Sequence, residues 1–414
     1  MVHLRWVASL LWVPFLWRGS LPLVRPNRIE WNPSLSPKTL RMKGYTIFYA
    51  VKGNGKPILL LHGYGAGMWV WEKQIDPLSQ FYKVYALDLI GHGFSDRPKI
   101  SYTPETYIHF LRDFMDGLGI ERAVIIGNSM GGGLGWAMAG LFPDRVEKLI
   151  LINAVPPDVL EQVKNESFKA LVAIKDLPLL PYLVIASRNR DSIRWILLDC
   201  VSNIRLITPE VLERQYQLSK IKGSTWVLYS TFKNAQEGIR LKDCLTRISQ
   251  PTLLIWGDRD PVLPLSVGKQ LHRIIPHSRL LIIEKGAHIP MWENSEEVNQ
   301  AILDFLKNSS GWFVRCSERG IRPPNVELFE EGEAKPGDIG DDGKSHQENS
   351  NEREAGEIEP QYRFFKTDAR DEEVDSQGRK GGSNFKVRED DDANMKGMNA
   401  IGLCYRRNEG DDDH

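Results

Sequence analysis

The chain of 414 residues carries 53 Lys and Arg against 54 Asp and Glu, which gives a formal net charge of −1. This balance argues against nucleic-acid binding through a broad basic face, and a hydrophobic fraction of 42% is enough for a large core. None of the four cysteines forms a C-x-x-C pair, so a zinc ribbon and a dithiol redox site are not expected. Four cysteines in a chain of this length also argue against a disulfide scaffold. They are Cys200, Cys244, Cys316 and Cys404.

Residues 1–35 form an apolar and basic N-terminal segment. Residues 6–17 read WVASLLWVPFLW, and Arg5 and Arg18 flank them. The apolar run has about half the length of a membrane span, and it fits a signal-peptide core or an interfacial anchor. Pro14 interrupts the run, and no small-residue cleavage site follows it. Two interpretations stay open: contact of residues 5–18 with a membrane surface, or no targeting role, which leaves a cytoplasmic or a membrane-associated protein.

Short apolar runs alternate with helical patterns between residues 36 and 155, the predicted first part of a core. Strands are predicted at 47–51, 58–61, 84–87, 123–126 and 148–152, and helices at 107–118 and 133–142. Gly53, Asn54 and Gly55 separate the first two strands and predict a hairpin turn, which would add an antiparallel edge. The alternation predicts an α/β protein whose mainly parallel sheet has helices on both faces.

Residues 156–250 break this alternation. Helical patterns occur at 167–175, 192–198, 209–218 and 226–232 without a strand series, so we expect a helical cap inserted late in the sheet. The core is predicted to resume over residues 251–309, with strands at 252–255 and 280–283 and a helix at 298–306. Residues 310–414 are charged, glycine-rich and poor in aliphatic side chains, and we expect a disordered tail there.

Ser129 is the candidate nucleophile. The sequence Gly127-Asn128-Ser129-Met130-Gly131 matches G-x-S-x-G, and it lies between a predicted strand and a predicted helix. A serine there must occupy a strained turn, and the flanking glycines remove side chains that would clash. The turn would present the hydroxyl at the carboxyl edge of the sheet, in front of a helix N-terminus that favours negative charge.

A serine hydroxyl needs a base, and His288 follows the last predicted strand at the same edge of the sheet. The imidazole in turn needs an acceptor that fixes its tautomer. Asp258 and Asp260 both follow the strand at 252–255. Asp260 lies further along the loop, so we expect it to be the acid and keep Asp258 as the reserve. The order Ser, Asp, His along the chain suits this arrangement.

The turn His62-Gly63-Tyr64-Gly65-Ala66-Gly67 follows another predicted strand. Its glycines would let the backbone approach a reacting carbonyl and offer N–H groups to the oxyanion. We expect the amides of Tyr64 and Met130 to be these donors and Gly63 to lie beside the substrate. The P-loop pattern is absent from the sequence, so phosphate binding by this turn is not favoured.

The sequence resembles the α/β-hydrolase superfamily over residues 40–307. The motifs that carry the resemblance are, in order, HGYGAG, DLIGHGFSD, GNSMGG, WGDRDPVLP and GAHIPMWE. The resemblance implies an α/β-hydrolase fold whose elbow and oxyanion loop are the turns at Ser129 and Tyr64. Because the nucleophile is Ser and not Asp, the haloalkane dehalogenases and soluble epoxide hydrolases of the superfamily are disfavoured.

GNSMGG and the pair Trp292-Glu293 resemble hydrolases that cleave carbon–carbon bonds in ring-fission products. The resemblance implies that Asn128 helps to bind substrate, and Arg214 is the candidate for the cap arginine of that group. The sequence departs from the group in a less glycine-rich oxyanion loop and in Ile289, where a tryptophan usually follows the histidine. We therefore expect carboxylic-ester cleavage first and carbon–carbon cleavage second.

A ligand-binding protein without activity on the same fold is the alternative from another class. The expected partner is a small molecule with an apolar part, with no metal, no organic cofactor and no nucleic acid. We expect several apolar side chains of the cap to line the pocket and four of its arginines to be solvated. The apolar candidates are Leu177, Leu179, Leu180, Leu183, Trp195, Leu197 and Leu198, and the arginines are Arg188, Arg190, Arg194 and Arg205.

Overall fold

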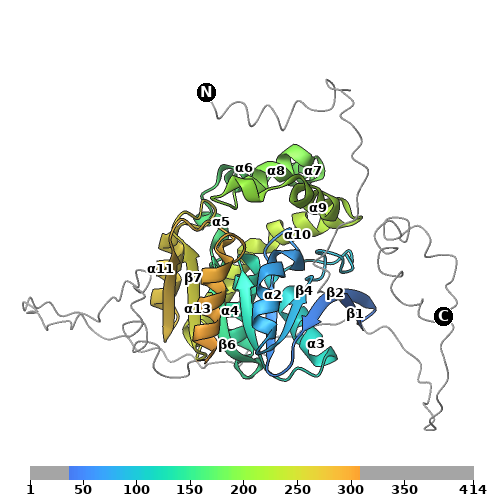
Figure 1. The fold of residues 1–414 in the computed structure, drawn as a ribbon. Coiled ribbons are helices and arrows are strands. Elements are labelled where there is room, and N and C mark those ends of the chain that lie inside the picture. Colours follow the sequence, from blue (N-terminus) through green and yellow to red (C-terminus); the bar gives the residue numbers. More distant parts are fainter. Residues whose placement is uncertain (1–36, 308–414) are drawn as a thin grey trace, which may run out of the picture. The chain divides into compact units, whose positions relative to one another are not determined.

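Residues 37–307 are described in a computed structural model, and they form one eight-stranded sheet with helices around it (Figure 1). The strand order is β1-β2-β4-β3-β5-β6-β7-β8. The strands are β1 (Pro37–Met42), β2 (Tyr45–Lys52), β3 (Pro57–Leu61), β4 (Lys83–Leu87), β5 (Ala123–Asn128), β6 (Val146–Ile152), β7 (Thr252–Gly257) and β8 (Ser278–Ile283). From β4 to β8 all neighbours are parallel, whereas β1–β2 and β2–β4 are antiparallel. The mainly parallel sheet confirms the predicted fold class.

The predicted hairpin at Gly53–Gly55 is wrong. β2 and β3 lie on opposite sides of β4 and do not pair with each other, and the antiparallel hairpin is instead β1–β2, which turns at Lys43 and Gly44. The turn at Gly53 instead brings the chain close to the segment that precedes β4. A side chain on Gly53, which has φ +82°, would come within 2.2 Å of the carbonyl oxygen of Tyr82. Glycine is therefore required because the chain passes close to the turn before β4.

Two apolar layers cover the two faces of the sheet. Alternate strand residues point to opposite sides, so Leu59 and Leu61 join one buried cluster and Ile58 and Leu60 the other. The first cluster contains side chains of α3 (Pro104–Gly117), α4 (Met130–Leu141) and α11 (Leu265–Ile274). The second contains those of η1 (Met68–Trp71), α2 (Glu72–Ser79), α12 (Pro290–Glu293) and α13 (Ser295–Lys307). Each fully buried leucine or isoleucine stabilises the fold by roughly 1.5–3 kcal/mol.

A helical insertion separates β6 from β7. It consists of α5 (Val159–Gln162), α6 (Glu166–Ala173), α7 (Leu180–Ala186), α8 (Arg190–Leu198), η3 (Ile204–Leu206), α9 (Pro209–Lys220), α10 (Ser224–Asn234) and η4 (Ala235–Arg247). Asn165, Asn189 and Thr208 accept backbone N–H groups at the starts of α6, α8 and α9, which explains why these helices begin where they do. Figure 1 shows α6 to α9 together at the top, above one edge of the sheet.

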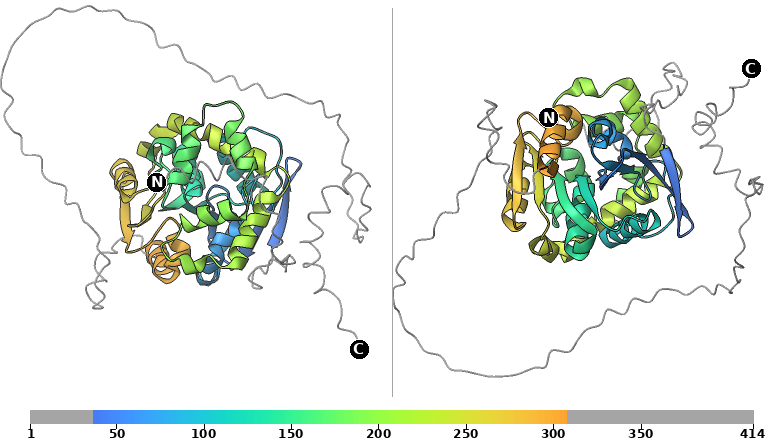
Figure 2. Two further views of the ribbon diagram at one scale, coloured as in Figure 1. Left: turned by 90° about the horizontal axis from the view of Figure 1, so that it is seen from above. Right: turned by 60° about the horizontal axis from the view of Figure 1, so that its bottom comes forward.

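The last part of the insertion returns the chain to the start of β7. η4 packs along α4, where a side chain on Gly140 would lie 2.5 Å from Cβ of Cys244. Seen from two other sides in Figure 2, the blue β1 and the gold β8 form opposite edges of the sheet. Strands β3, β5, β7 and β8 run parallel, so their carboxyl ends, which carry the candidate site residues, lie at the same end of the sheet.

Residues 1–36 and 308–414 lie outside the described part of the chain. The expectations for the segment at 5–18 and for the tail at 310–414 fall there and stay predictions. Over residues 37–307, no helix is both long and apolar enough to cross a bilayer.

Candidate active site

Ser129 occupies a sharp turn between β5 and α4. Its backbone has φ 53° and ψ −118°, a conformation that L-residues rarely adopt. A side chain on Gly127 would come within 2.2 Å of the carbonyl oxygen of Gly131, and one on Gly131 within 2.1 Å of that of Leu61. Only glycines allow this turn, and a strained serine of this kind is a feature of functional sites.

His288 lies in the loop after β8, with its ring between Ser129 and Asp260. Nε2 lies 2.9 Å from Oγ of Ser129, and Nδ1 lies 2.8 Å from Oδ2 of Asp260. An ionised carboxylate can only accept, so Nδ1–H donates to Asp260 and Nε2 is left to accept the serine hydroxyl proton. His288 and Asp260 are both buried. The structure therefore brings together the three residues that the sequence nominated.

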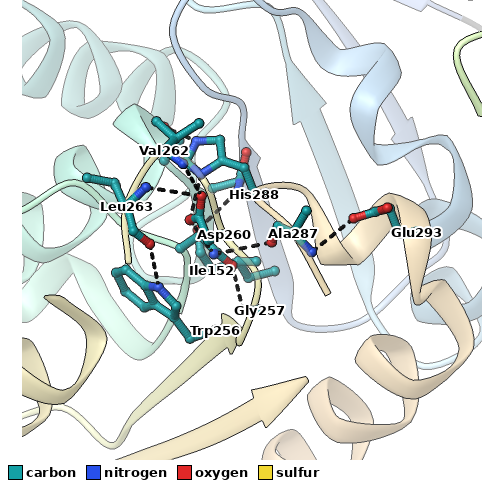
Figure 3. A network of polar contacts seen from close by, with 12 residues as sticks. Ile152, Trp256, Gly257, Asp260, Val262, Leu263, Ala287, His288 and Glu293 are labelled. Carbon is teal, nitrogen blue, oxygen red and sulfur yellow. Dashed lines mark hydrogen bonds and ion pairs between the residues drawn. The ribbon is translucent and has the colours of Figure 1, made fainter. Parts of the chain in front are cut away.

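Asp260 is held by more than the histidine. Its Oδ1 accepts the backbone N–H groups of Val262 and Leu263 at 2.8 and 3.0 Å (Figure 3). Its Oδ2 accepts Nδ2 of Asn153 at 2.6 Å in addition to the imidazole. Asp258, the reserve candidate, is exposed and two residues away. The carboxylate that contacts His288 is that of Asp260.

Asn153 is a member of the site that the sequence analysis missed. It follows β6 directly, has φ 44° and is fully buried. Its Nδ2 donates to Asp260, and its Oδ1 accepts the N–H of Gly257 at 3.4 Å. Asparagine adopts the left-handed conformation more readily than most residues. The sequence feature that could have identified Asn153 is its place directly after the predicted strand at 148–152, as a polar residue at the carboxyl end of the sheet.

The loop at residues 62–67, which is expected to bind the oxyanion, passes directly beside Ser129. A side chain on Gly63 would lie 3.2 Å from Cβ of Ser129, so only glycine gives the loop this close approach. Tyr64 and Met130, the two expected amide donors, both line the cavity next to Ser129. Met130 is also the first residue of α4, whose first-turn N–H groups have no partner within the helix.

The buried ring of His62 fixes the loop. Its Nε2 accepts the N–H of Leu89 at 3.0 Å, so the proton is on Nδ1, which donates to the carbonyl oxygen of Gly63 at 2.8 Å. Burial lowers the pKa of His62 to about 4. The ring therefore stays neutral at pH 7, and its two hydrogen bonds join the loop at Gly63 to the backbone at Leu89.

Asn128 does not face the cavity. Its Nδ2 donates to the backbone carbonyl oxygens of Ile152 and His288 at 3.1 and 3.0 Å, which uses both N–H bonds. The side chain is buried and is absent from the cavity lining. The substrate contact expected of Asn128 stays a prediction, and its amide here joins the backbone of His288 to β6.

A cavity of ≈ 130 Å³ opens beside Ser129. Its walls are mainly apolar and come from the α3 region, α4, α5, α6, α10, η4 and the loop after β7. The insertion contributes Val159, Leu160, Phe168, Val172, Thr231 and Phe232. Within residues 37–307, no group of three or more His, Cys, Asp or Glu side chains is arranged to hold a metal ion.

The apolar side chains predicted to line the pocket do not do so. Leu177, Leu179, Leu183 and Trp195 are 51%, 70%, 58% and 53% exposed, and none of the seven candidates lines the cavity. The reason is the layering of the insertion: α5, α6 and α10 form the wall, whereas α7 and α8 lie outside it. The prediction assigned the right character to the pocket but the wrong helices.

The arginines of the insertion also differ from expectation. Arg214 lies outside the cavity lining, where Nη1 is 3.3 Å from Oε2 of Glu72 and the guanidinium is 5.8 Å from the Trp69 ring centroid. Arg188, predicted to be solvated, is partly buried and donates to the carbonyl oxygen of Ile185 at 2.7 Å and to Oγ1 of Thr225 at 2.9 Å. Burial lowers its pKa. Three others are exposed: Arg190, Arg194 and Arg205.

The fold and the edge of the sheet just described define an α/β hydrolase. A family model described as alpha/beta hydrolase fold matches residues 56–295, and the chain belongs to this family. The match covers the five motifs from HGYGAG to GAHIPMWE. The protein is therefore a hydrolase.

Similar proteins cover several hydrolase activities. Epoxide hydrolase 3 of Xenopus tropicalis is 30% identical over 65% of this chain and 77% of its own length. A solved meta-cleavage product hydrolase from Pseudomonas fluorescens IP01 is 26% identical with a TM-score of 0.56, over 66% of this chain and 98% of its own. A solved membrane phospholipase A, a bacterial virulence factor, is 30% identical with a TM-score of 0.55, over 66% and 86%.

Proposed function

We propose that the protein is a serine esterase that cleaves carboxylic esters with an apolar acyl or alcohol part. Ser129 Oγ attacks the ester carbonyl carbon while Nε2 of His288 takes the hydroxyl proton and Asp260 stabilises the imidazolium. The N–H groups of Tyr64 and Met130 bind the oxyanion. The alcohol leaves with the proton of His288, and water then cleaves the acyl-enzyme by the same steps to release the acid.

The observation that carries the proposal is the hydrogen-bonded chain from Asp260 through His288 to Ser129 beside an apolar cavity. No charged side chain occurs among the described residues that line this cavity. Burying an ion there without a partner would be costly, so the cavity suits an uncharged apolar group. The likeness to a solved membrane phospholipase A agrees with this class.

The serine also argues against epoxide opening, although epoxide hydrolases are among the relatives. Attack of Ser129 Oγ on an epoxide carbon would form an ether. An ether has no carbonyl carbon that water could attack with help from an oxyanion hole, so the enzyme would stay alkylated. A carbonyl substrate instead gives an acyl ester that water can cleave.

Carbon–carbon cleavage of diketone acids is the second candidate, because the chain is 28% and 26% identical to two solved structures of meta-cleavage product hydrolase. Such a substrate brings a carboxylate, which needs a cation beside the reacting carbonyl. Arg214 pairs with Glu72 outside the cavity lining, so the described cavity offers no such partner. Ester cleavage therefore stays the first choice.

The test compares wild type with Ser129→Ala and with Ser187→Ala, an exposed serine outside the site. We expect wild type and Ser187→Ala to hydrolyse medium-chain p-nitrophenyl esters and to be labelled by a fluorophosphonate. Ser129→Ala should lose roughly 10⁴-fold or more in turnover and all labelling, since alanine cannot form the acyl-enzyme. Unchanged turnover in Ser129→Ala overturns the assignment, and a strong preference for a diketone acid over esters selects the second candidate.

A further inference from the structure

Glu293 is the last residue of α12, five residues after His288, and its carboxylate holds two separate segments of the chain. Oε2 accepts the N–H of Ala287 at 3.0 Å, the residue before the base (Figure 3). Oε1 accepts the N–H groups of Ser202 and Asn203 at 2.6 and 2.9 Å. One side chain therefore joins the histidine loop to the part of the helical insertion that lies between α8 and η3.

A backbone contact runs parallel to this carboxylate bridge. The N–H of His288 donates to the carbonyl oxygen of Cys200 at 3.1 Å. Residues 200–203 of the insertion are thus bonded to residues 287 and 288 both directly and through Glu293. The backbone of His288 is therefore held by hydrogen bonds to the insertion as well as by the core.

The bridge has a fixed end on the core. α12 is tied to α2, because Nζ of Lys73 donates to the carbonyl oxygen of Trp292 at 2.7 Å and Nε2 of Gln74 to that of Met291 at 2.5 Å. Glu293 reaches from this anchored helix toward both segments. A shift of residues 200–203 would therefore break the hydrogen bonds of Glu293 while α12 stays in place.

Only a carboxylate can serve both segments. Its two oxygens are acceptors, and every partner here is a backbone N–H donor. A glutamine keeps one acceptor oxygen, and its NH₂ group would face an N–H on the other side. Loss of the contact on either side breaks the bridge, and because the N–H of His288 donates to the carbonyl oxygen of Cys200, we expect the two segments to loosen together.

We propose that Glu293 is a positioning residue that links the helical insertion to the base, so that His288 reaches Ser129 only while residues 200–203 keep their hydrogen bonds to Glu293 and to His288. The inference rests on the proposed role of His288 as base. Glu293 is absent from the cavity lining, so it acts through backbone placement and not through substrate contact. The insertion would then govern catalysis as well as access.

The test uses Glu293→Gln and Glu293→Asp, whose side chain is one methylene too short to reach both segments. The matched control is Asp96→Asn, because Asp96 also accepts a backbone N–H, that of Thr46 at 2.7 Å, far from the base along the sheet. Turnover of a p-nitrophenyl ester is measured per folded molecule. We expect kcat to fall about 10- to 100-fold in both Glu293 variants, with KM within about threefold of wild type and no loss in the control, since misplacing a reacting group by about 1 Å costs on this order.

Two further measurements separate positioning from simple stability. Fluorophosphonate labelling, which needs the base but no substrate contact, should slow by the same factor as kcat. Hydrogen exchange should be slow in wild type at the amides of Ala287, Ser202 and Asn203, and it should become faster on both segments together in Glu293→Gln.

Each outcome has one meaning. Normal kcat per folded molecule in both Glu293 variants overturns the inference, as does unprotected exchange at these amides in wild type. Exchange that rises on only one segment also overturns it, because no link would then exist. Failure of wild-type labelling counts against the proposed function alone, and the exchange measurement still decides whether the insertion and the histidine loop are linked.

Discussion

Replacing Asp260 with asparagine is the sharpest test of the proposed triad, because the carboxylate accepts four hydrogen bonds and an amide cannot. Oδ2 accepts from His288 and Asn153, and Oδ1 accepts from the backbone N–H groups of Val262 and Leu263. In whichever way the new amide is turned, its NH₂ group faces donors. With the NH₂ group toward Val262 and Leu263, two fixed backbone N–H groups lose their acceptor. With the NH₂ group toward His288, the ring must move its proton to Nε2, where it can no longer accept the proton of Ser129.

The size of the effect follows from that tautomer. An imidazole held in the wrong tautomer lowers kcat by roughly 10⁴-fold in serine hydrolases, which corresponds to about 5 kcal/mol of transition-state stabilisation. The buried donors left without acceptors should also lower the free energy of unfolding by roughly 1–3 kcal/mol. Loss of activity should therefore far exceed loss of stability.

The assay is kcat/KM for a p-nitrophenyl ester, normalised to folded protein, with Asp258→Asn as the control. Asp258 is exposed, so its amide variant should stay within about twofold of wild type, as surface substitutions usually do. A normal rate in Asp260→Asn, or a larger loss in Asp258→Asn, would refute the reasoning. The order of the two variants decides between the carboxylates.

Three further variants test other parts of the structure. Arg214→Ala should change ester turnover by less than about threefold, because its partner Glu72 lies outside the cavity lining, and a larger loss would contradict this. A loss of about 1.5–3 kcal/mol in transition-state binding of a diketone acid would favour the second candidate function. Relative to His62→Gln, wild type should lose about 3 kcal/mol of stability between pH 6.5 and pH 4 in urea unfolding. The reason is that the unfolded chain binds a proton at the ordinary pKa near 6.5 and the folded chain only near 4; a parallel pH dependence would refute it. Leu179→Asn should raise the free energy of unfolding by about 0.5–1 kcal/mol, because Leu179 is 70% exposed with φ 62°; a lower melting temperature would count against it.

The sequence was most informative where local chemistry is strict. The turn at Ser129 tolerates only glycine at two neighbours, and this requirement appears directly as G-x-S-x-G. The fold class followed from alternating apolar runs, since parallel strands buried on both faces are continuously apolar. Asp260 was preferred to Asp258 from its place in the loop, and the contact with His288 is in fact made by Asp260.

What the sequence did not reveal depends on contacts between distant segments. Asn153 and Glu293 act on residues that only the folded sheet and insertion bring near them. The partner of β2 is β4 and not its neighbour β3, because strand order is decided by tertiary packing and not by the turn at Gly53. α2 was missed because Pro77 lies inside it, and a proline normally argues against a helix interior.

The connection between β6 and β7 has a consequence for recombination. These strands are parallel neighbours, and η4 alone returns the chain along α4 to the start of β7. Helices α5 to α10 are additional to that return, so a foreign cassette could be grafted between residues 156 and 234 without altering strand order. The graft would still have to present a carbonyl oxygen to His288 and backbone donors to Glu293, as residues 200–203 do. Chimeras that exchange substrate preference should therefore retain activity only when the graft brings its own version of this short segment.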